Sequence, residues 1–135
     1  AYHFRAGDFA WFWHNSTGIM KAGNAESEAV ANALVNLPEC VDVQLNAIVG
    51  FGLVTSAYRD ALAYVALTKP KVALPNHHDA WTPGIGGGAS AYETSWLEAV
   101  GKLPNPPEVD YLLDPVDYMK PRSYNINDPR WAGGC

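Results

Sequence analysis

The sequence predicts an α/β protein built on a layered sheet, because apolar strand patterns alternate with helical patterns along the chain. The expected order is β-α-β-α-β-α-β, which is typical of a sheet covered by helices. The chain has 135 residues, of which 48% are hydrophobic, and this length and composition favour one domain with a packed core. No internal repeat or low-complexity linker divides the sequence, so we treat residues 1–135 as one unit.

The first expected strand lies in the segment DFAWFWHNSTG, residues 8–18. Apolar side chains fill every position from Phe9 to Trp13, so both faces are apolar, as in a strand that is buried on both sides. The turn-forming residues 15–18 end this strand.

A helix is expected over residues 24–38, with Asn24 as its N-cap and Pro38 at its end. Its apolar residues have the spacing of one helical face; they are Val30, Ala33, Leu34 and Leu37. The next expected strand, residues 40–50, alternates apolar with polar side chains. Its more polar face consists of Asp42, Gln44 and Asn46.

A second helix is expected over residues 55–70, with Thr55 or Ser56 as its cap and an apolar face of Tyr58, Ala61, Leu62 and Val65. A short apolar strand follows at residues 71–75. Beyond the glycine-rich residues 82–88, Ser90 and Glu93 form a capping box that begins a third helix, with an apolar face of Tyr92, Trp96, Val100 and Leu103. Residues 106–115 provide the last expected strand, and residues 116–135 form an irregular tail along the surface.

The net charge and the missing motifs argue against several classes of binding partner. The net charge is −5 and the pI is about 5.2, which argues against nucleic acid because a basic patch would be expected there. No apolar run reaches the roughly 18 residues of a membrane span. The sequence has neither a G-x-G-x-x-G fingerprint nor a Walker A motif, so nucleotide binding has no support.

The two cysteines, Cys40 and Cys135, are too few for a disulfide scaffold. Two thiols are the favoured state on general cysteine usage, and a mutual disulfide is the alternative. The scarcity of lysine, the many Trp, Tyr and Pro residues and the C-terminal cysteine favour a secreted or periplasmic protein.

Two expected strands end in residues that could form a site. The first ends at His14-Asn15-Ser16-Thr17 and the third at Asn76-His77-His78-Asp79, and ligands of such folds gather at the carboxyl ends of strands. Imidazole and carboxylate groups bind zinc and iron. The same residues also suit hydrogen-bonded loops. Neighbours on an extended chain point to opposite sides, so we expect only one of the adjacent histidines to face a given metal.

Four segments resemble the C-terminal half of metallo-β-lactamase-fold hydrolases: WHNSTG, VDVQLNAIVG, YRDALAYVALTKPKVALPNHHD and PPEVDYLLDP. The resemblance extends from Phe9 to about Trp131. It implies an α+β chain that forms half of a four-layer αββα sandwich, with a mixed sheet and flanking helices. Residues 1–135 would then be a single C-terminal half-domain.

The resemblance also implies a site. In that family one strand ends in a metal-bridging Asp and a later strand ends in P-x-H, whose His is a metal ligand; the matching positions here are Asn15 and His77. The metal would be one or two zinc ions, or another divalent transition metal. His78 and Asp79 would orient His77, and His14 would contribute a proton or a hydrogen bond near the leaving group. The substrate entrance would lie beside Trp81 and the glycine loop 84–88, which contains Gly86.

The implied activity is hydrolysis of a small-molecule ester, lactone, amide or phosphodiester by a metal-bound hydroxide. Two departures from the family pattern bear on it. The family signature H-x-H-x-D-H is absent, so a second chain or segment must supply the N-terminal half-domain, and this chain alone could lack a metal. Asn15 is neutral where the family has an anionic bridge, and an amide is a poorer bridging ligand.

Two other functions therefore stay open. The chain could be a non-catalytic subunit or binding module of the same fold that has lost its metal. It could also be an independent α/β domain with a metal site of its own at His77 and Asp79.

Overall fold

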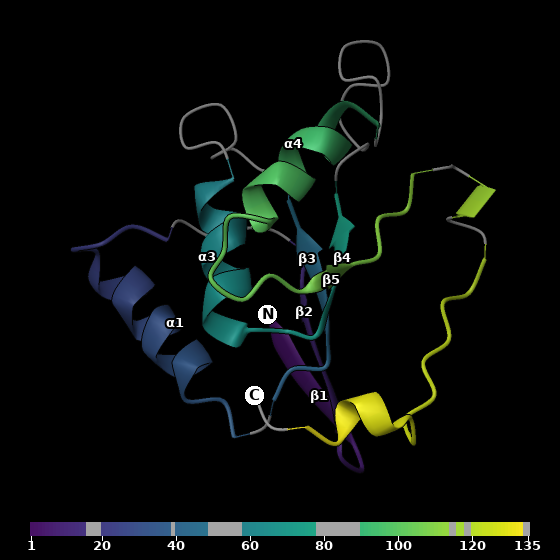
Figure 1. Ribbon diagram of the computed structural model, residues 1–135. Coiled ribbons are helices and arrows are strands. Elements are labelled where there is room, and N and C mark those ends of the chain that lie inside the picture. Colours follow the sequence, from purple (N-terminus) through teal and green to yellow (C-terminus); the bar gives the residue numbers. More distant parts are fainter. Residues whose placement is uncertain are drawn as a thin grey trace.

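The computed structural model describes residues 1–15, 20–38, 40–48, 58–77, 90–113, 116–117 and 120–133. Within these ranges the protein is mixed α/β, as the sequence predicts, with a five-stranded sheet and three α-helices (Figure 1). The elements are β1 (Tyr2–Ala6), β2 (Phe9–His14), α1 (Ala25–Val35), β3 (Val43–Ala47), α3 (Arg59–Thr68), β4 (Val72–Asn76), α4 (Ser90–Val100), β5 (Glu108–Val109) and the 3-10 helix η2 (Pro129–Trp131).

The sheet has the strand order β1-β2-β3-β4-β5. The β1–β2 pair is antiparallel, and β2 through β5 are parallel. Parallel strands that add in sequence through right-handed crossovers place every connecting helix on the same face of the sheet. Figure 1 shows α1, α3 and α4 on that face, and the C-terminal segment on the other side.

The strand β1 lies before the first strand expected from the sequence. Tyr2 lies opposite Trp13 and Phe4 lies opposite Trp11, so the apolar residues of β1 share one face with the odd-numbered residues of β2. The two strands are joined at Gly7, whose φ of 63° suits a residue without a Cβ. The alternation of Tyr2 and Phe4 with His3 and Arg5 was the strand signal.

The buried face of α1 differs from the predicted one. Val30 is 38% exposed, whereas Ser27 and Leu34 are buried. The cap is as predicted, since Asn24 Oδ1 accepts from the Ser27 backbone N–H at 2.8 Å. Ser27 Oγ in turn accepts from the Lys21 backbone N–H at 3.2 Å. These bonds at the start of the helix turn the Ser27 side inward, and the scattered alanines of α1 impose no competing face.

The predicted face of α3 is confirmed: Tyr58, Ala61 and Val65 are buried. Tyr58 is the N-cap and makes no side-chain capping bond; the expected caps Thr55 and Ser56 lie outside the described residues. The third helix begins at Ser90 as expected. The last strand is much shorter than the predicted 106–115, because only residues 108–109 pair with β4 and Pro106 and Pro107 before them have no N–H to donate.

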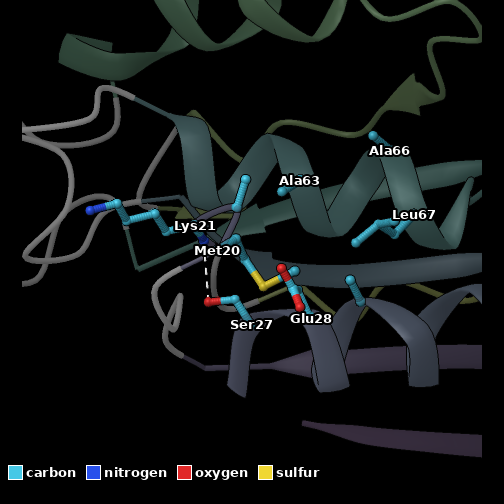
Figure 2. Close-up of a pocket in the computed structure, with 9 residues that line it drawn as sticks. Met20, Lys21, Ser27, Glu28, Ala63, Ala66 and Leu67 are labelled. Atoms are coloured by element: carbon cyan, nitrogen blue, oxygen red, sulfur yellow. Dashed lines mark hydrogen bonds between the residues drawn. The ribbon is translucent and has the colours of Figure 1, made fainter. Parts of the chain in front are cut away.

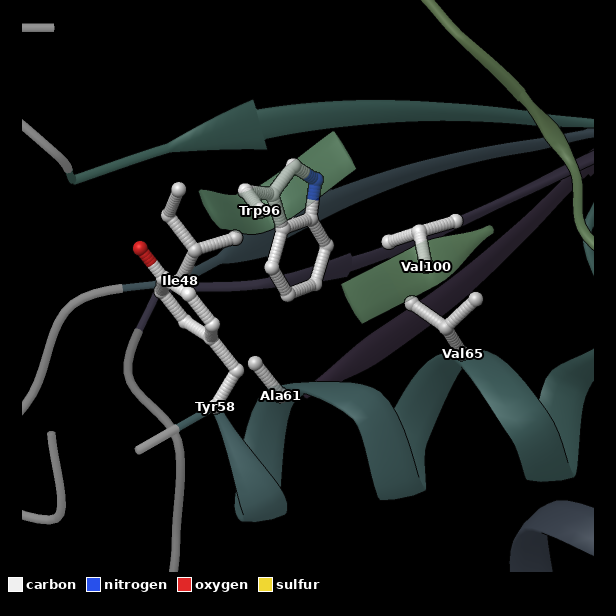
Figure 3. Packing of buried hydrophobic residues seen from close by; sticks show 6 residues of the cluster. All are labelled: Ile48, Tyr58, Ala61, Val65, Trp96 and Val100. Carbon is white, nitrogen blue, oxygen red and sulfur yellow. The ribbon is translucent and has the colours of Figure 1, made fainter. Parts of the chain in front are cut away.

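The core between the sheet and the helices α3 and α4 is shown in Figure 3. Trp96 from α4 is fully buried and meets the ring of Tyr58 edge-on, with centroids 5.2 Å apart. The Tyr58 hydroxyl lies 2.7 Å from Ser95 Oγ. Burial raises the pKa of Tyr58, and the Ser95 hydrogen bond opposes that rise. The rest of this cluster comprises Ile48, Ala61, Val65 and Val100.

The opposite face of the sheet is partly covered by the C-terminal segment. Trp131 is buried and packs edge-on against Phe9, with ring centroids 5.3 Å apart. Its indole N–H donates to the Asn125 carbonyl at 2.7 Å, and the Arg130 guanidinium lies 4.0 Å above its ring. The tail therefore follows the surface as predicted, but its described part is anchored and includes a helical turn.

A buried ion pair at the amino-terminal edge of the parallel strands fastens this segment. Asp42 Oδ1 lies 2.9 Å from Lys71 Nζ, and Asp42 Oδ2 accepts from the Ala10 N–H at 2.9 Å. Lys71 Nζ also donates to the carbonyls of Trp131 at 2.7 Å and Gly133 at 3.1 Å. One lysine therefore joins the start of β4 to the start of the β2–β3 pairing and to the tail.

Cys40, two residues before Asp42, is disulfide-bonded, so the favoured expectation of two thiols is wrong for Cys40. The other cysteine of the sequence, Cys135, lies outside the described residues. The expectation rested on how often cysteines are found as thiols in general. It could not include the fold, in which Lys71 holds the carbonyls of Trp131 and Gly133 close to Asp42.

Replacing Lys71 with Met should lower the free energy of unfolding by roughly 2–4 kcal/mol, because it leaves the buried Asp42 carboxylate without its counter-charge. Chemical denaturation of the purified protein measures the change. Lys102→Met, at an exposed position after α4, is the matched control and should change stability by less than about 0.5 kcal/mol. Equal effects of the two substitutions would contradict the role given to the ion pair.

Candidate functional site

The fold brings the predicted strand ends to one edge of the sheet. His14 ends β2 and Asn76 ends β4, and both strands run parallel to β3 between them. His14 is in register with Asn46, and Ala47 is in register with Asn76. The ends of β2 and β4 are therefore about 10 Å apart, which is two inter-strand spacings, and they are not neighbours.

Pro75 is accommodated because of where β5 stops. The backbone groups of Lys71 and Ala73 face β5, since their carbonyls accept from Glu108 and Asp110. By alternation Pro75 faces the same side, but the paired part of β5 ends at Val109, opposite Ala73. Proline has no N–H with which to continue this ladder, so its position matches the point where the pairing with β5 ends.

His77 leaves the strand in the left-handed conformation, with φ of 58°. The residue is partly buried, and the preceding Asn76 carbonyl still accepts from the Ile48 N–H at 3.1 Å. A non-glycine residue with this φ is uncommon and needs support from its surroundings. The expectation that adjacent histidines point to opposite sides assumed an extended chain, and His77 does not meet that condition. His78, Asp79, Trp81 and Gly86 lie outside the described residues.

His14 and Asn15 have different surroundings. His14 is 2% exposed on the helix side of the sheet, where its imidazole stacks on Tyr64 with centroids 4.4 Å apart. Asn15, the next residue, is exposed. His14 therefore supports the end of β2 from beneath α3, whereas Asn15, the first residue after β2, is open to solvent.

Asn46 lies near the same edge, and its sequence pattern alone did not indicate a place in a site. It is 0% exposed, and neither its Oδ1 nor its Nδ2 has a hydrogen-bond partner within the part of the chain that the structure describes. Buried amides of this kind are rare, because an unmade hydrogen bond costs about 1–3 kcal/mol. The predicted polar face of residues 40–50 was the available signal, but alternation alone did not show that this face lies under the helices.

The donors at this edge fit a metal only in part. His77 offers an imidazole, and Asn15 and Asn76 offer amide oxygens, whereas a zinc site takes four donors, mostly from His, Cys and carboxylates. In the described ranges no three His, Cys, Asp or Glu side chains are grouped closely enough to hold an ion. The described part of the chain could therefore supply a fraction of a coordination shell.

A groove of about 340 Å³ lies between α1 and α3 on the helical side (Figure 2). Two of its lining residues are charged, Lys21 and Glu28, and the Glu28 carboxylate accepts from the Gly23 N–H at 3.0 Å. The remaining lining is largely apolar: Met20, Ala22, Ala31, Ala63, Ala66 and Leu67, with Ser27 at the edge. No His, Cys or second carboxylate lies beside Glu28 among the described lining residues, so the groove does not assemble a metal site or an acid–base pair there.

No protein-family model, curated protein or solved structure matches the chain. In the described ranges, no helix combines the length and the apolar character that crossing a membrane requires.

Replacing Asn46 with Asp should lower the free energy of unfolding at pH 7 by at least about 3 kcal/mol, because the carboxylate would be buried without a partner. The loss should shrink as the pH falls, since burial raises the pKa of the new carboxyl and protonation removes its charge. Denaturant melts at several pH values measure this. Asn105→Asp, at an exposed position before β5, is the control; if both variants melt alike, Asn46 is not sealed from water.

Proposed function

We propose that this chain is the C-terminal half of a metal-dependent hydrolase with the metallo-β-lactamase fold, and that a second chain or segment supplies the other half. The observation that carries the proposal is the one-sided covering of the sheet. In a four-layer αββα sandwich each sheet has helices on one face and the other sheet on its second face. Here the three described α-helices lie on one face. The second face is aromatic over β1 and β2, and η2 and the tail cover it only in part.

We call Tyr2, Phe4, Trp11 and Trp13 the aromatic face. Their rings stack across β1 and β2, with centroids 5.6 Å apart for Tyr2–Trp13 and 4.9 Å for Phe4–Trp11. Tyr2 is 60% exposed and Phe4 is 39% exposed. Contiguous apolar surface of this kind marks an interface. Trp131 and Tyr124 cover the adjoining residues Phe9, Val43 and Leu74 but leave the rings of β1 open, which supports packing of a second half there.

The carboxyl edge supports the chemical part of the proposal. His77 and Asn15 would be this chain's contribution to a metal site, and the missing half would supply the remaining donors. A zinc ion bound there would act as a Lewis acid toward a small-molecule ester, lactone, amide or phosphodiester. His77 has a left-handed backbone with φ of 58°, directly after β4, at the position where the family presents a ligand.

A second candidate is a non-catalytic binding module of the same fold. The neutral Asn15 favours it, because an amide lacks the charge that a bridge between two cations requires. In that case the carboxyl edge would bind a ligand through amide groups, without a metal.

We also propose an exported location. A disulfide at Cys40 suits an oxidising compartment such as the periplasm or the exterior of the cell.

The native protein should have a mass well above the 14.6 kDa of this chain, because the aromatic face needs a cover. Intact-mass measurement and size-exclusion chromatography of material from its natural source test this. Co-purification with a half-domain of similar size, or with a longer continuous chain, is the expected result. A monodisperse 14.6 kDa species with a cooperative melt would contradict the half-domain proposal.

Replacing His77 with Ala should remove most of the bound metal from the assembled protein, since loss of a first-sphere imidazole weakens binding by orders of magnitude. Elemental analysis after dialysis gives the metal content per chain. His3→Ala on β1 is the matched control and should keep its metal. The proposal fails if both variants hold as much zinc as the parent, and the binding module gains support if the parent itself holds none.

Asn15→Asp should raise metal affinity in the assembled protein, because the substitution adds an anionic oxygen at an exposed strand end. The change is nearly isosteric, so the melting curve should stay the same. Titration with zinc, followed by competition with a chelator, measures affinity. Asn105→Asp carries the same charge change at the opposite edge of the sheet. If the two substitutions have equal effects, the gain comes from overall charge and Asn15 is only a turn residue.

A further inference from the structure

Three buried polar side chains lie in a row beneath α3. They come from three elements: His14 at the end of β2, Gln44 in β3 and Thr68 at the end of α3. Gln44 Nε2 lies 3.4 Å from His14 Nε2. The Thr68 hydroxyl donates to Gln44 Oε1.

The donors and acceptors in these two hydrogen bonds can be assigned from the chemistry of each group. An amide oxygen only accepts and an amide NH2 only donates. Because Gln44 Oε1 faces Thr68, the NH2 of Gln44 faces His14, and His14 Nε2 must accept from it. A neutral imidazole carries one proton, so that proton lies on Nδ1. The stacked ring of Tyr64 holds the plane of the imidazole.

The Thr68 hydroxyl could instead donate to a second acceptor, and this would give a different set of hydrogen bonds. Its hydroxyl lies 2.8 Å from the Tyr64 carbonyl, but a hydroxyl has one proton and bonds one acceptor with it. If that proton went to Tyr64, the Gln44 amide could reverse, with NH2 toward Thr68 and Oε1 toward His14. His14 would then carry its proton on Nε2. The two arrangements predict opposite tautomers, so the ring proton reports which one exists.

We propose that Thr68 and Gln44 are positioning residues that fix His14 in its Nδ1–H tautomer. The two bonds link the end of β2, directly before Asn15, through Gln44 in β3 to the end of α3. This inference goes beyond the proposed hydrolase, because it concerns the helix side of the sheet and needs neither a metal nor a substrate. It holds equally for an enzyme and for a binding module.

Nitrogen NMR of the 15N-labelled native protein, with any accompanying chain present, tests the proposal above the ordinary imidazole pKa of about 6.5. A pyridine-type signal for His14 Nε2 and a pyrrole-type signal for Nδ1 are expected. The reverse pattern in the unmodified protein would overturn the proposal, whatever the variants do.

Thr68→Val removes the hydroxyl that orients Gln44 at nearly constant volume, so a substantial population of the Nε2–H tautomer should appear. Thr68→Ser restores a hydroxyl and should restore the original signals. Thr94→Val, at an exposed position of α4, controls for the substitution and should leave the signals unchanged. If the folded Thr68→Val variant keeps the same His14 tautomer, the positioning role proposed for Thr68 is wrong. Should that variant not fold, the tautomer of the unmodified protein still decides the proposal.

Discussion

The buried ion pair between Asp42 and Lys71 is the constraint on which most of the structure depends. A carboxylate in the interior is tolerated only when it is paired and hydrogen-bonded. Asp42 meets this requirement through the Lys71 ammonium and the Ala10 N–H, which come from the strands on either side of β3. The arrangement therefore exists only when β2, β3 and β4 are in register. Because Lys71 also binds the Trp131 and Gly133 carbonyls, the same interaction closes the second face of the sheet over Phe9.

The two edges of the parallel strands differ in how well their polar groups are satisfied. At the amino edge the charges and carbonyls around Asp42 are paired. At the carboxyl edge, His77 has a left-handed backbone, and the buried Asn46 amide has no partner within the described part of the chain. Natural proteins depart from local rules mainly where function requires it. This contrast is a physical reason, separate from any resemblance, to look for the site at the carboxyl edge.

Local periodicity was sufficient to predict the central strands, the three helices, the Asn24 cap and the buried face of α3. It failed where the outcome depends on partners far apart in sequence. The face of α1 is set by bonds around Ser27 rather than by Val30, and the last strand is cut short where its pairing with β4 ends. Alternation identified Asn46 as polar but could not show that helices cover it. The tie between Asp42 and Lys71 spans 29 residues, and no pattern within either segment indicates it. His77 was found from the strand-end pattern, but its φ depends on a backbone that the pattern does not describe.

The anchoring of the tail has a consequence for biosynthesis. The Lys71 ammonium binds a carbonyl 60 residues further along the chain, and contacts of such long range form late because their loop closure is entropically costly. Once the nascent chain has left the ribosome as far as Val109, all five described strands are available, yet the apolar residues around Phe9 stay uncovered until Trp131 follows. A nascent chain that pauses between these points displays a finished sheet with an uncovered surface, which chaperones bind and which favours aggregation.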